Sequence, residues 1–257
     1  MFDSRKEQLK NRIIVGSYSQ LQLKLKNIYF NKLKAIKLKH SEVIWAKYPS
    51  ALTCCIIEPR VIETLPGVLN NMANIYANKN VGLTIFHGLK NETYVKEITK
   101  TWKNVNYINM NVINLDLSAY SRILTQKNFY KNFKSKFVLI FQWDSYIFKE
   151  IPQYYYNFDY VGAPWKIKFG NNCGNGGISL RNVKTMLDKS TFSGEIMAED
   201  KYFSKQDITV CDDFNKHIEF SCESIFYKSP YCCHKPYSSM YDINKYQDYI
   251  DFLNRIE

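Results

Sequence analysis

The chain has 257 residues, of which 46% are hydrophobic, enough to form the core of one large globular α/β domain. This composition excludes a disordered chain, and no apolar run reaches the length of about eighteen residues that a membrane-spanning helix needs. The net charge of +11 indicates an anionic partner without naming it, since nucleic acid, a phosphorylated sugar donor and an anionic membrane would all suit it.

The start of the chain and its cysteines bear on the compartment. The first residues, MFDSRKEQLK, lack the apolar stretch of a signal peptide, and the cysteines number seven, which is odd. Both features favour a cytoplasmic protein with reduced thiols over a secreted protein with disulfide bonds. The adjacent pairs Cys54/Cys55 and Cys232/Cys233 lack the spacing of zinc knuckles, so structural zinc is not expected.

The segment 1–50 is rich in lysine and precedes the main apolar pattern. Across residues 5–48, leucines and isoleucines alternate with lysines, which predicts one or two amphipathic basic helices. Two interpretations stay open: a helical arm packed on the domain, or an arm that contacts an anionic membrane or a partner protein. We therefore expect a basic helical arm over 1–50 and one domain over 51–257.

The domain begins with a strand, a helix and a second strand. Residues 52–57 (LTCCII) predict a buried strand that ends at Pro59 and Arg60, the spacing across 61–77 predicts a helix, and VGLTIFHG predicts a strand that ends at His87. Such a start predicts a doubly wound, mostly parallel sheet with helices on both faces.

Four further elements follow in the first half of the domain. The pattern predicts a helix over 94–102, a short edge strand over 107–113, a helix over 118–128 that carries Tyr120, and a central strand over 137–141. The last of these ends abruptly in Gln142, Trp143 and Asp144.

Polar side chains at the carboxyl ends of strands are candidates for ligand binding, because ligands of open α/β sheets bind there. Asp144 is the strongest of them, although a carboxylate after a strand also serves as a turn or helix cap. Arg60 and His87 occupy the same edge, where each alone would be an ordinary exposed polar residue.

A cluster of small residues, GNGG, follows about thirty residues later. Asn175, Gly176 and Gly177 would let the backbone approach a ligand closely before the patterned residues 178–180. The cluster does not match GxGxxG, and GxxxxGK[ST] does not occur, so dinucleotide and phosphate-loop sites lose their usual support.

The last third adds carboxylates and a histidine. A helix is predicted over 183–189, and Glu199 and Asp200 begin another, where a helix dipole alone would favour acidic residues. His234 stands beside Lys235 in a loop, as a surface residue or as a metal ligand. Residues 243–256 predict a terminal helix.

The ordered motifs resemble one family of predicted GT-A-like glycosyltransferases that is catalogued as a domain of unknown function. FQxD, YxGAPW and GNGGxSLR carry the resemblance, together with IIEPR, IFHG followed by Asn91, AED, FSCES and HKPY, over roughly residues 51–240. It implies a GT-A fold, a Rossmann-like sheet that binds a nucleotide-sugar donor at the carboxyl ends of its strands. The arm lies outside it.

The resemblance also implies roles for single residues. Asp144 is the one acidic position that remains of a DxD motif, which in such folds holds a divalent ion at the donor diphosphate, and Gln142 would add an amide oxygen or orient the ribose. His234 becomes the second metal ligand and Lys235 a diphosphate contact. These ligands suit Mg²⁺ or Mn²⁺, with the imidazole favouring Mn²⁺. The other implied donor contacts are Pro59, Arg60, His87, Tyr120, Asn175, Gly176 and Gly177.

The implied activity is an inverting, metal-dependent transfer from a nucleotide-sugar, with a UDP-sugar favoured, to a hydroxyl of a glycan, protein or lipid. Asp200 would be the general base, and Glu199 its neighbour that binds acceptor hydroxyls. The alternative is a GT-A-fold protein that binds sugar nucleotides or glycans without turnover. Specific nucleic-acid binding is not expected, because no recognised motif supports it.

Overall fold

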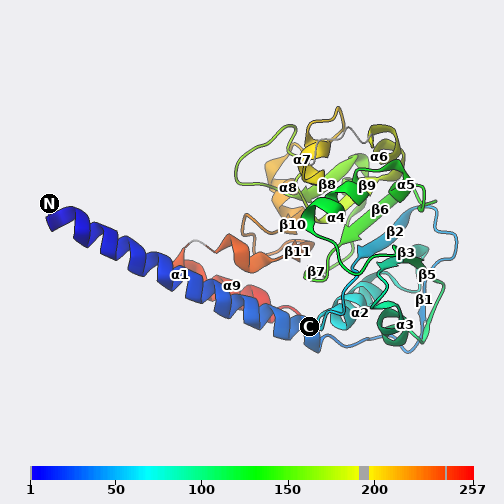
Figure 1. The fold of residues 1–257 in the computed structure, drawn as a ribbon, viewed down its shortest axis with the longest axis horizontal. Helices are drawn as coiled ribbons and strands as arrows, with labels where there is room; N and C mark the ends of the chain where they lie inside the picture. The colour runs from blue at the N-terminus through cyan, green and yellow to red at the C-terminus, as the bar shows by residue number, and fades with distance from the viewer. Residues whose placement is uncertain (1, 191–196, 241) are drawn as a thin grey trace.

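A six-stranded sheet forms the centre of the molecule (Figure 1). The computed structural model describes residues 2–190, 197–240 and 242–257, and for 2–18 and 243 it describes the backbone alone. The strand order is β5-β3-β2-β6-β9-β8. These strands are β2 (Leu52–Ile57), β3 (Val81–His87), β5 (Val105–Asn109), β6 (Phe137–Phe141), β8 (Tyr160–Ala163) and β9 (Asn175–Asn182).

The sheet is mostly parallel, as predicted. β2 pairs in parallel with β3 and β6, and β3 pairs in parallel with β5. β9 runs antiparallel to both of its neighbours, β6 and β8. Since β2 and β6 lie in the middle, their carboxyl ends, residues 58–60 and 142–144, come side by side at one edge of the sheet.

Helices cover both faces of the sheet, which confirms the predicted α/β class. Side chains of β2 alternate between two buried clusters, with Cys54 and Ile56 in the first and Cys55 and Ile57 in the second. The first lies under α1, α2 and α9, and the second under α4 to α7. The helices are α1 (Phe2–Ala35), α2 (Leu65–Tyr76), α3 (Glu92–Ile98), α4 (Leu117–Leu124), α5 (Lys127–Tyr130), α6 (Val183–Lys189), α7 (Glu199–Ser204), α8 (Phe214–Phe220) and α9 (Tyr246–Asn254), with short 3-10 turns at Gln153–Asn157, Pro236–Ser239 and Ile243–Lys245.

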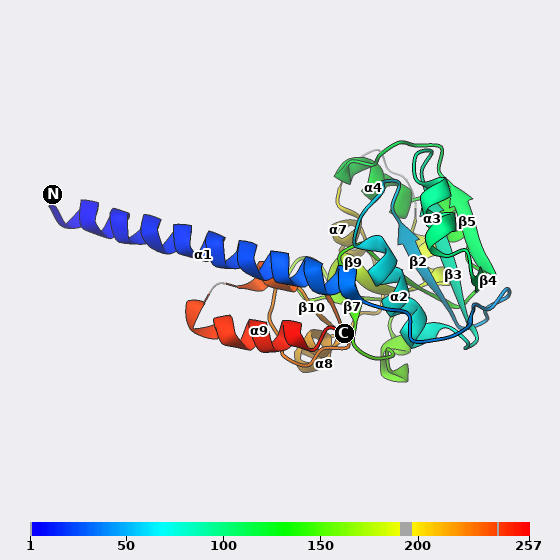
Figure 2. The same cartoon turned by 90° about the horizontal axis from the view of Figure 1, so that it is seen from below.

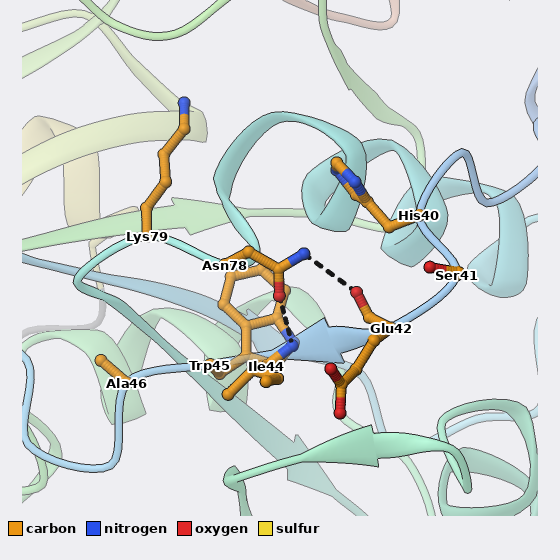
Figure 3. A pocket seen from close by; sticks show the side chains of 8 residues that line it. All are labelled: His40, Ser41, Glu42, Ile44, Trp45, Ala46, Asn78 and Lys79. Carbon is orange, nitrogen blue, oxygen red and sulfur yellow. Dashed lines mark hydrogen bonds between the residues drawn. The ribbon is translucent and has the colours of Figure 1, made fainter.

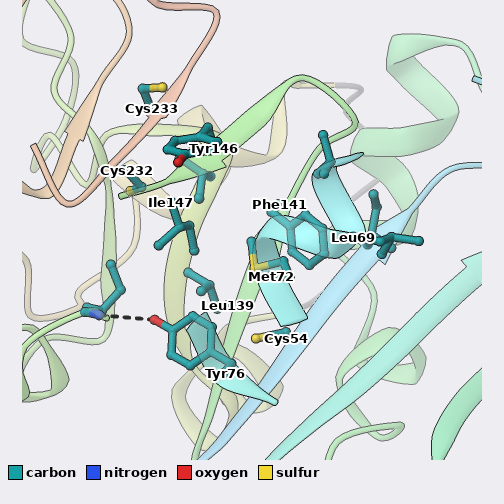
Figure 4. Close-up of a cluster of buried hydrophobic side chains, with 14 of the residues drawn as sticks. Cys54, Leu69, Met72, Tyr76, Leu139, Phe141, Tyr146, Ile147, Cys232 and Cys233 are labelled. Carbon is teal, nitrogen blue, oxygen red and sulfur yellow. Dashed lines mark hydrogen bonds between the residues drawn. The ribbon is translucent and has the colours of Figure 1, made fainter. Parts of the chain in front are cut away.

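The first cluster joins the sheet to α2 (Figure 4). Leu69, Met72 and Tyr76 of α2 face Leu139 and Phe141 of β6, as expected for a helix whose apolar residues recur every three or four positions. The hydroxyl of Tyr76 accepts a hydrogen bond of 3.1 Å from the amide of residue 151, so this tyrosine is buried with its polar atom paired.

A second sheet of three strands lies next to the carboxyl end of β6 and was not predicted. Its order is β10 (Ser221–Cys222), β11 (Cys232–His234) and β7 (Ser145–Ile147). β11 pairs antiparallel with β7 and places His234 opposite Ser145. Since β7 begins directly after Asp144, this register brings His234 to Asp144 across ninety residues of chain.

The helix α1 begins far from the rest of the molecule and packs on it with its second half (Figures 1 and 2). Leu25, Tyr29 and Leu33 are fully buried in the first cluster, and α9 lies alongside α1 (Figure 2). Packing on the domain, one of the two interpretations of the arm, therefore holds for this half. The predicted division at residue 50 stays a prediction, although Trp45 belongs to the same cluster.

Several predicted bounds needed correction. The helical prediction for 5–48 is wrong after Ala35, because Val43–Ile44 forms β1 and pairs in parallel with β4 (Trp102–Lys103). The helix predicted over 118–128 is divided, since the hydroxyl of Thr125 donates to the carbonyl of Ser121 (3.0 Å) where α4 ends. Within the described part of the chain, no helix is both long and apolar enough to cross a membrane.

Candidate active site

A pocket of about 190 Å³ lies at the carboxyl ends of β2 and β6. Four of the residues predicted to bind the donor come together in its wall. Pro59 and Arg60 follow β2, Gln142 follows β6, and Tyr120 comes from α4. The rest of the wall consists of Ile57, Glu58, Leu115, Asp116, Leu117 and Trp143.

Arg60 is held in the wall of this pocket by Glu58. Its Nε and Nη2 donate to the two carboxylate oxygens of buried Glu58 at 2.7 and 2.8 Å, and these hydrogen bonds raise the pKa of Arg60. The guanidinium also lies 5.9 Å from the ring centre of Trp143. The side-chain amide of Asn91 donates to the carbonyls of both Glu58 and Arg60, so this loop has a fixed shape.

His87 is not in this wall. It ends β3 and is 2% exposed, and its Nδ1 lies 3.0 Å from the carbonyl oxygen of Gly88. Gly88 in turn donates its amide to Asn91. In the structure His87 is thus part of the support below the loop, and a contact with the donor stays a prediction.

Asp144, His234 and Glu223 form a buried row beside the pocket. His234 places Nε2 3.1 Å from Oδ1 of Asp144 and Nδ1 3.0 Å from Oε2 of Glu223. Nζ of Lys235 lies 3.6 Å from the other oxygen of Asp144. Asp144 is completely buried and His234 is 3% exposed, so these charges interact in a medium of low dielectric constant.

The charges of this row support one another. Burial opposes protonation of His234, but the carboxylates of Glu223 and Asp144 outweigh burial and raise its pKa to about 9. Burial would raise the pKa of Asp144, but His234 and then Lys235 outweigh that effect, and the pKa lies below its ordinary value. The arrangement therefore stabilises a positive group between two carboxylates.

The same atoms lack hydrogen bonds of normal geometry. Both carboxylate oxygens of Asp144, both ring nitrogens of His234 and Oε2 of Glu223 are buried without such a bond among the described residues. These buried oxygens would fit a bound cation if Nε2 of His234 gave up its proton to become a ligand, because a metal ion binds only a deprotonated ring nitrogen. No group of three or more His, Cys, Asp or Glu side chains arranged to hold a metal occurs in the described ranges.

The glycine cluster packs against the charged side chains of the site. A Cβ on Gly177 would lie 2.0 Å from Nδ1 of His234, and a Cβ on Gly176 would lie 2.0 Å from Oε1 of Glu199. Asn175, which begins β9, donates to Glu223 at 2.7 Å and accepts from the amide of Gly177. The sequence predicted that the backbone here approaches a ligand closely, and the structure shows it close to two of the protein's own side chains, those of His234 and Glu199. Their contact with a donor stays a prediction.

Glu199 is fixed by a buried arginine. Nη2 of Arg181 lies 3.2 Å from Oε1 of Glu199, and the guanidinium also donates to Tyr130, Tyr160 and Ser179. Arg181 is completely buried, so its charge depends on this carboxylate and these hydroxyls. Glu199 therefore has a structural partner within the protein.

Asp200 is the less constrained of the two adjacent carboxylates. It begins α7 with Glu199, and its Oδ1 accepts a hydrogen bond from the amide of Lys201 at 2.7 Å. Burial and then the charge of Glu199 raise the pKa of Asp200 to about 6. An aspartate of this kind is ionised at neutral pH and is more basic than an ordinary one, as a general base requires.

A larger pocket at the other end of the sheet contains none of the predicted residues (Figure 3). Its volume is about 530 Å³, and β1 forms part of its wall. The amide of Ala46 in this wall donates to the carbonyl of Val81, the first residue of β3, so the pocket lies at the amino ends of the strands. Ligands of open α/β sheets bind at the opposite end.

Sequence reasoning missed three residues of the site. Glu223 stands in FSCES, one of the motifs that carry the family resemblance, and that motif was its signal. The signal for Arg181 was its position, because it is a charged residue inside a strand pattern. Tyr29 left no local signal, yet its hydroxyl donates to the carbonyl of Asp144 at 2.8 Å.

One family model matches the chain, and solved structures resemble it weakly. The family described as "Protein of unknown function (DUF5672)" matches residues 103–248 of the 257. This agrees with the coarser part of the sequence prediction, a family of unknown function. No curated protein matches the chain.

The similar structures include two of TarS 1-349 from S. aureus and one of HddC from Yersinia pseudotuberculosis. TarS in complex with UDP has a TM-score of 0.44 and 14% identity, over 63% of this chain and 58% of that chain. TarS 1-349 alone has a TM-score of 0.45 and 14% identity, over 80% of this chain and 71% of that chain. HddC has a TM-score of 0.41 and 11% identity, over 62% of this chain and 88% of that chain. The chain thus spans less than two thirds of the first of these structures.

Proposed function

The chain belongs to the family described as "Protein of unknown function (DUF5672)", and on the geometry of its site we propose that it is a glycosyltransferase of the GT-A type. The observation that carries the proposal is the pairing of β11 with β7, which brings His234 to Asp144 beside a pocket at the carboxyl ends of the strands. A pocket with a cation-binding pair at this edge suits a nucleotide-sugar donor, since its diphosphate is anionic.

The pocket supplies contacts for the nucleoside. Tyr120 and Trp143 provide aromatic faces for a flat base, and Gln142 provides an amide that can donate or accept. The hydroxyl of Tyr120 is buried against the side chain of Gln142, so the two side chains together can bind a polar group of the ligand. We place a UDP-sugar first among the possible donors.

Asp144 and His234 are the two residues that would hold Mn²⁺ or Mg²⁺. Their facing atoms are 3.1 Å apart, close to the separation of about 3 Å between neighbouring ligands at about 2.1 Å in an octahedral site. Glu223 at the other ring nitrogen would orient the imidazole. When bound, the ion would neutralise charge on the donor diphosphate, and Lys235 would add a second positive charge there.

Transfer then needs a base for the acceptor. The acceptor hydroxyl oxygen forms a bond to the anomeric carbon while the bond from that carbon to the diphosphate oxygen breaks, and its electron pair leaves with the nucleoside diphosphate. The hydroxyl proton passes to the carboxylate of Asp200, whose pKa of about 6 supports this role. Glu199 is buried and paired with Arg181, so its contact with acceptor hydroxyls stays a prediction and the proton transfer is assigned to Asp200.

Donor binding is tested by the thermal stability of the protein with UDP-, GDP- and dTDP-sugars, with and without Mn²⁺. A donor present at a hundred times its Kd should stabilise the fold by about 2.7 kcal/mol. The proposal predicts stabilisation by at least one donor class that increases with Mn²⁺. Stabilisation by none of them at millimolar concentration would contradict it.

Turnover distinguishes the enzyme from a binding protein of the same fold. The enzyme should release nucleoside diphosphate from the donor that binds, slowly to water and faster with an acceptor, whereas the binding protein should release none. An inverting reaction predicts a product with the opposite anomeric configuration to the donor, measured by proton NMR. The acceptor class, the contact of the basic arm with a membrane or protein, and a cytoplasmic location stay predictions.

A further inference from the structure

A second pocket of about 380 Å³ lies next to the proposed base. One side is the segment 165–169, which follows β8, and the other side includes the first turn of α7. The residues that line it are Trp165, Lys166, Ile167, Lys168, Phe169, Lys201 and Ser224.

Two residues that line this pocket directly follow residues of the candidate active site in the chain. Lys201 follows Asp200, and the amide of Lys201 donates to the Asp200 carboxylate at 2.7 Å. Ser224 follows Glu223, the carboxylate that faces His234. A molecule in this pocket would therefore lie within a few residues of the base and of the cation-binding row, where an acceptor has to be.

The wall combines aromatic rings with positive charge. The rings of Trp165 and Phe169 are 6.2 Å apart and nearly perpendicular at 85°, and Nζ of Lys201 lies 5.6 Å from the centre of the Phe169 ring. Ile167 is 85% exposed and Lys168 is also exposed. No acidic side chain is among the described residues that line the pocket, although Asp200 and Glu223 directly precede the lining residues Lys201 and Ser224 in the chain.

This chemistry fits one class of molecule. The flat face of an aromatic ring packs against the apolar C–H face of a sugar ring, while ammonium groups attract carboxylate, phosphate or sulfate. A neutral glycan would use only the rings, whereas Lys168 and Lys201 add positive charge that suits an anionic group. Resting on the proposed function, we propose that this pocket is the acceptor site and that its acceptor is an anionic glycan.

The test measures binding of short oligosaccharides by calorimetry. The probes are an oligogalacturonate, its methyl ester, which is neutral, and a phosphorylated mannose oligosaccharide. The oligogalacturonate or the phosphorylated probe should bind at least roughly tenfold more tightly than the ester, since each contact with a charged group is among the stronger hydrogen bonds. Which of the two binds better identifies the anionic group.

Charge reversal in the pocket supplies the control. Lys168→Glu combined with Lys201→Glu should lower the affinity for the anionic probe by roughly tenfold or more. The matched control is Lys131→Glu combined with Lys100→Glu, which changes the net charge equally at exposed lysines outside the pocket and should have little effect. Trp165→Ala should weaken the anionic and the neutral probe alike, because the ring contact is common to both.

The outcomes separate this inference from the proposed function. UDP binding that persists in the double variant, with the anionic probe lost, supports the acceptor site. UDP binding without preference for the anionic probe over its ester overturns the inference and leaves the glycosyltransferase intact. Binding of the anionic probe in a protein that binds no sugar nucleotide supports the pocket and contradicts the proposed function. Tighter, pocket-dependent binding of an oligouridylate would also overturn the inference, in favour of nucleic acid.

Discussion

Glu199 and Asp200 are adjacent in sequence but have different environments. Arg181 is completely buried and pairs with Glu199, whereas Asp200 accepts a hydrogen bond from the backbone amide of Lys201 and has the pKa of about 6. The sequence suggested Asp200 as the base through a family pattern, and the structure adds a physical reason, since Glu199 is occupied. The same contrast predicts that substitution of Asp200 lowers turnover and that substitution of Glu199 lowers stability.

Asp200→Asn should keep the fold and the affinity for the donor and should lower turnover by roughly a hundredfold, as expected for loss of a general base. Glu199→Ala should instead destabilise the protein by about 3 kcal/mol, because it leaves the Arg181 charge buried without its partner. Urea unfolding and turnover of both variants check this. Equal turnover of Asp200→Asn and the parent would remove Asp200 from the mechanism.

The pH dependence of turnover follows from the same pKa. The base must be ionised, so kcat/KM should rise with pH up to about 6 and level off above it. Residual activity of Asp200→Asn should lack this limb. A profile in which the parent and the variant share the limb would assign it to another group.

The two glycines of the cluster offer a matched pair at neighbouring positions. Gly177→Ala would place a methyl group 2.0 Å from Nδ1 of His234, and Gly176→Ala would place one 2.0 Å from Glu199. We expect Gly177→Ala to weaken metal-dependent UDP binding at least tenfold by displacing the imidazole. Gly176→Ala should keep that binding and lose stability or turnover. Identical effects of both on UDP binding would show that the glycines contact the donor instead.

At the scale of elements, α1 is part of the fold from Leu25 onward. Its buried residues recur as Leu25, Tyr29 and Leu33, one every four positions, and Tyr29 reaches the carbonyl of Asp144. Phe30 also packs 5.4 Å from the ring of Trp143. The arm therefore supports the loop that carries Asp144, and deletion of 1–45 would remove core residues.

A comparison within α1 tests this packing. Leu33→Ala should lower the free energy of unfolding by about 2–5 kcal/mol, because Leu33 is fully buried. Leu23→Ala on the same helix should change it by less than about 0.5 kcal/mol, since Leu23 is 55% exposed. Denaturant unfolding of both measures the difference. Equal small effects would mean that α1 is not docked in solution.

The elements also show what the sequence could predict. β2, β3, β6 and α6 were predicted within one residue of their bounds, because each is a dense apolar run or a helical pattern next to polar residues. β7, β10 and β11 were not predicted, since strands of two or three residues carry no periodicity. The candidate site depends on those short strands, so the sequence named Asp144 and His234 but only their pairing places them together.

At the scale of the whole molecule, one buried histidine should make stability depend on pH. His217 is 2% exposed, its Nε2 lies 2.9 Å from the carbonyl of Gly162, and burial lowers its pKa to about 4. The unfolded chain binds this proton below a pKa of about 6.5 and the folded chain only below about 4, so stability falls as the pH drops between these values.

The expected loss is about 3 kcal/mol across that window, from about 1.4 kcal/mol for each pKa unit. Asp200 affects stability in the opposite direction. Its raised pKa means that the folded chain binds this proton below about pH 6, before the unfolded chain does, so stability rises as the pH drops. Subtracting the stability curve of His217→Gln from that of the parent isolates the histidine. A difference that does not change between pH 7 and pH 4 would contradict the buried neutral imidazole.

In the proposed function, a nucleotide pocket, a cation-binding pair and a base share the carboxyl edge of one sheet. The proposed function depends above all on the cation-binding pair, and calorimetry of UDP with and without Mn²⁺ tests that pair most directly. The parent should bind UDP at least tenfold more tightly with Mn²⁺, and Asp144→Asn should lose that gain while unfolding at a similar urea concentration. An equal gain in the parent and in Asp144→Asn, or no gain in either, would contradict a metal site at Asp144 and His234.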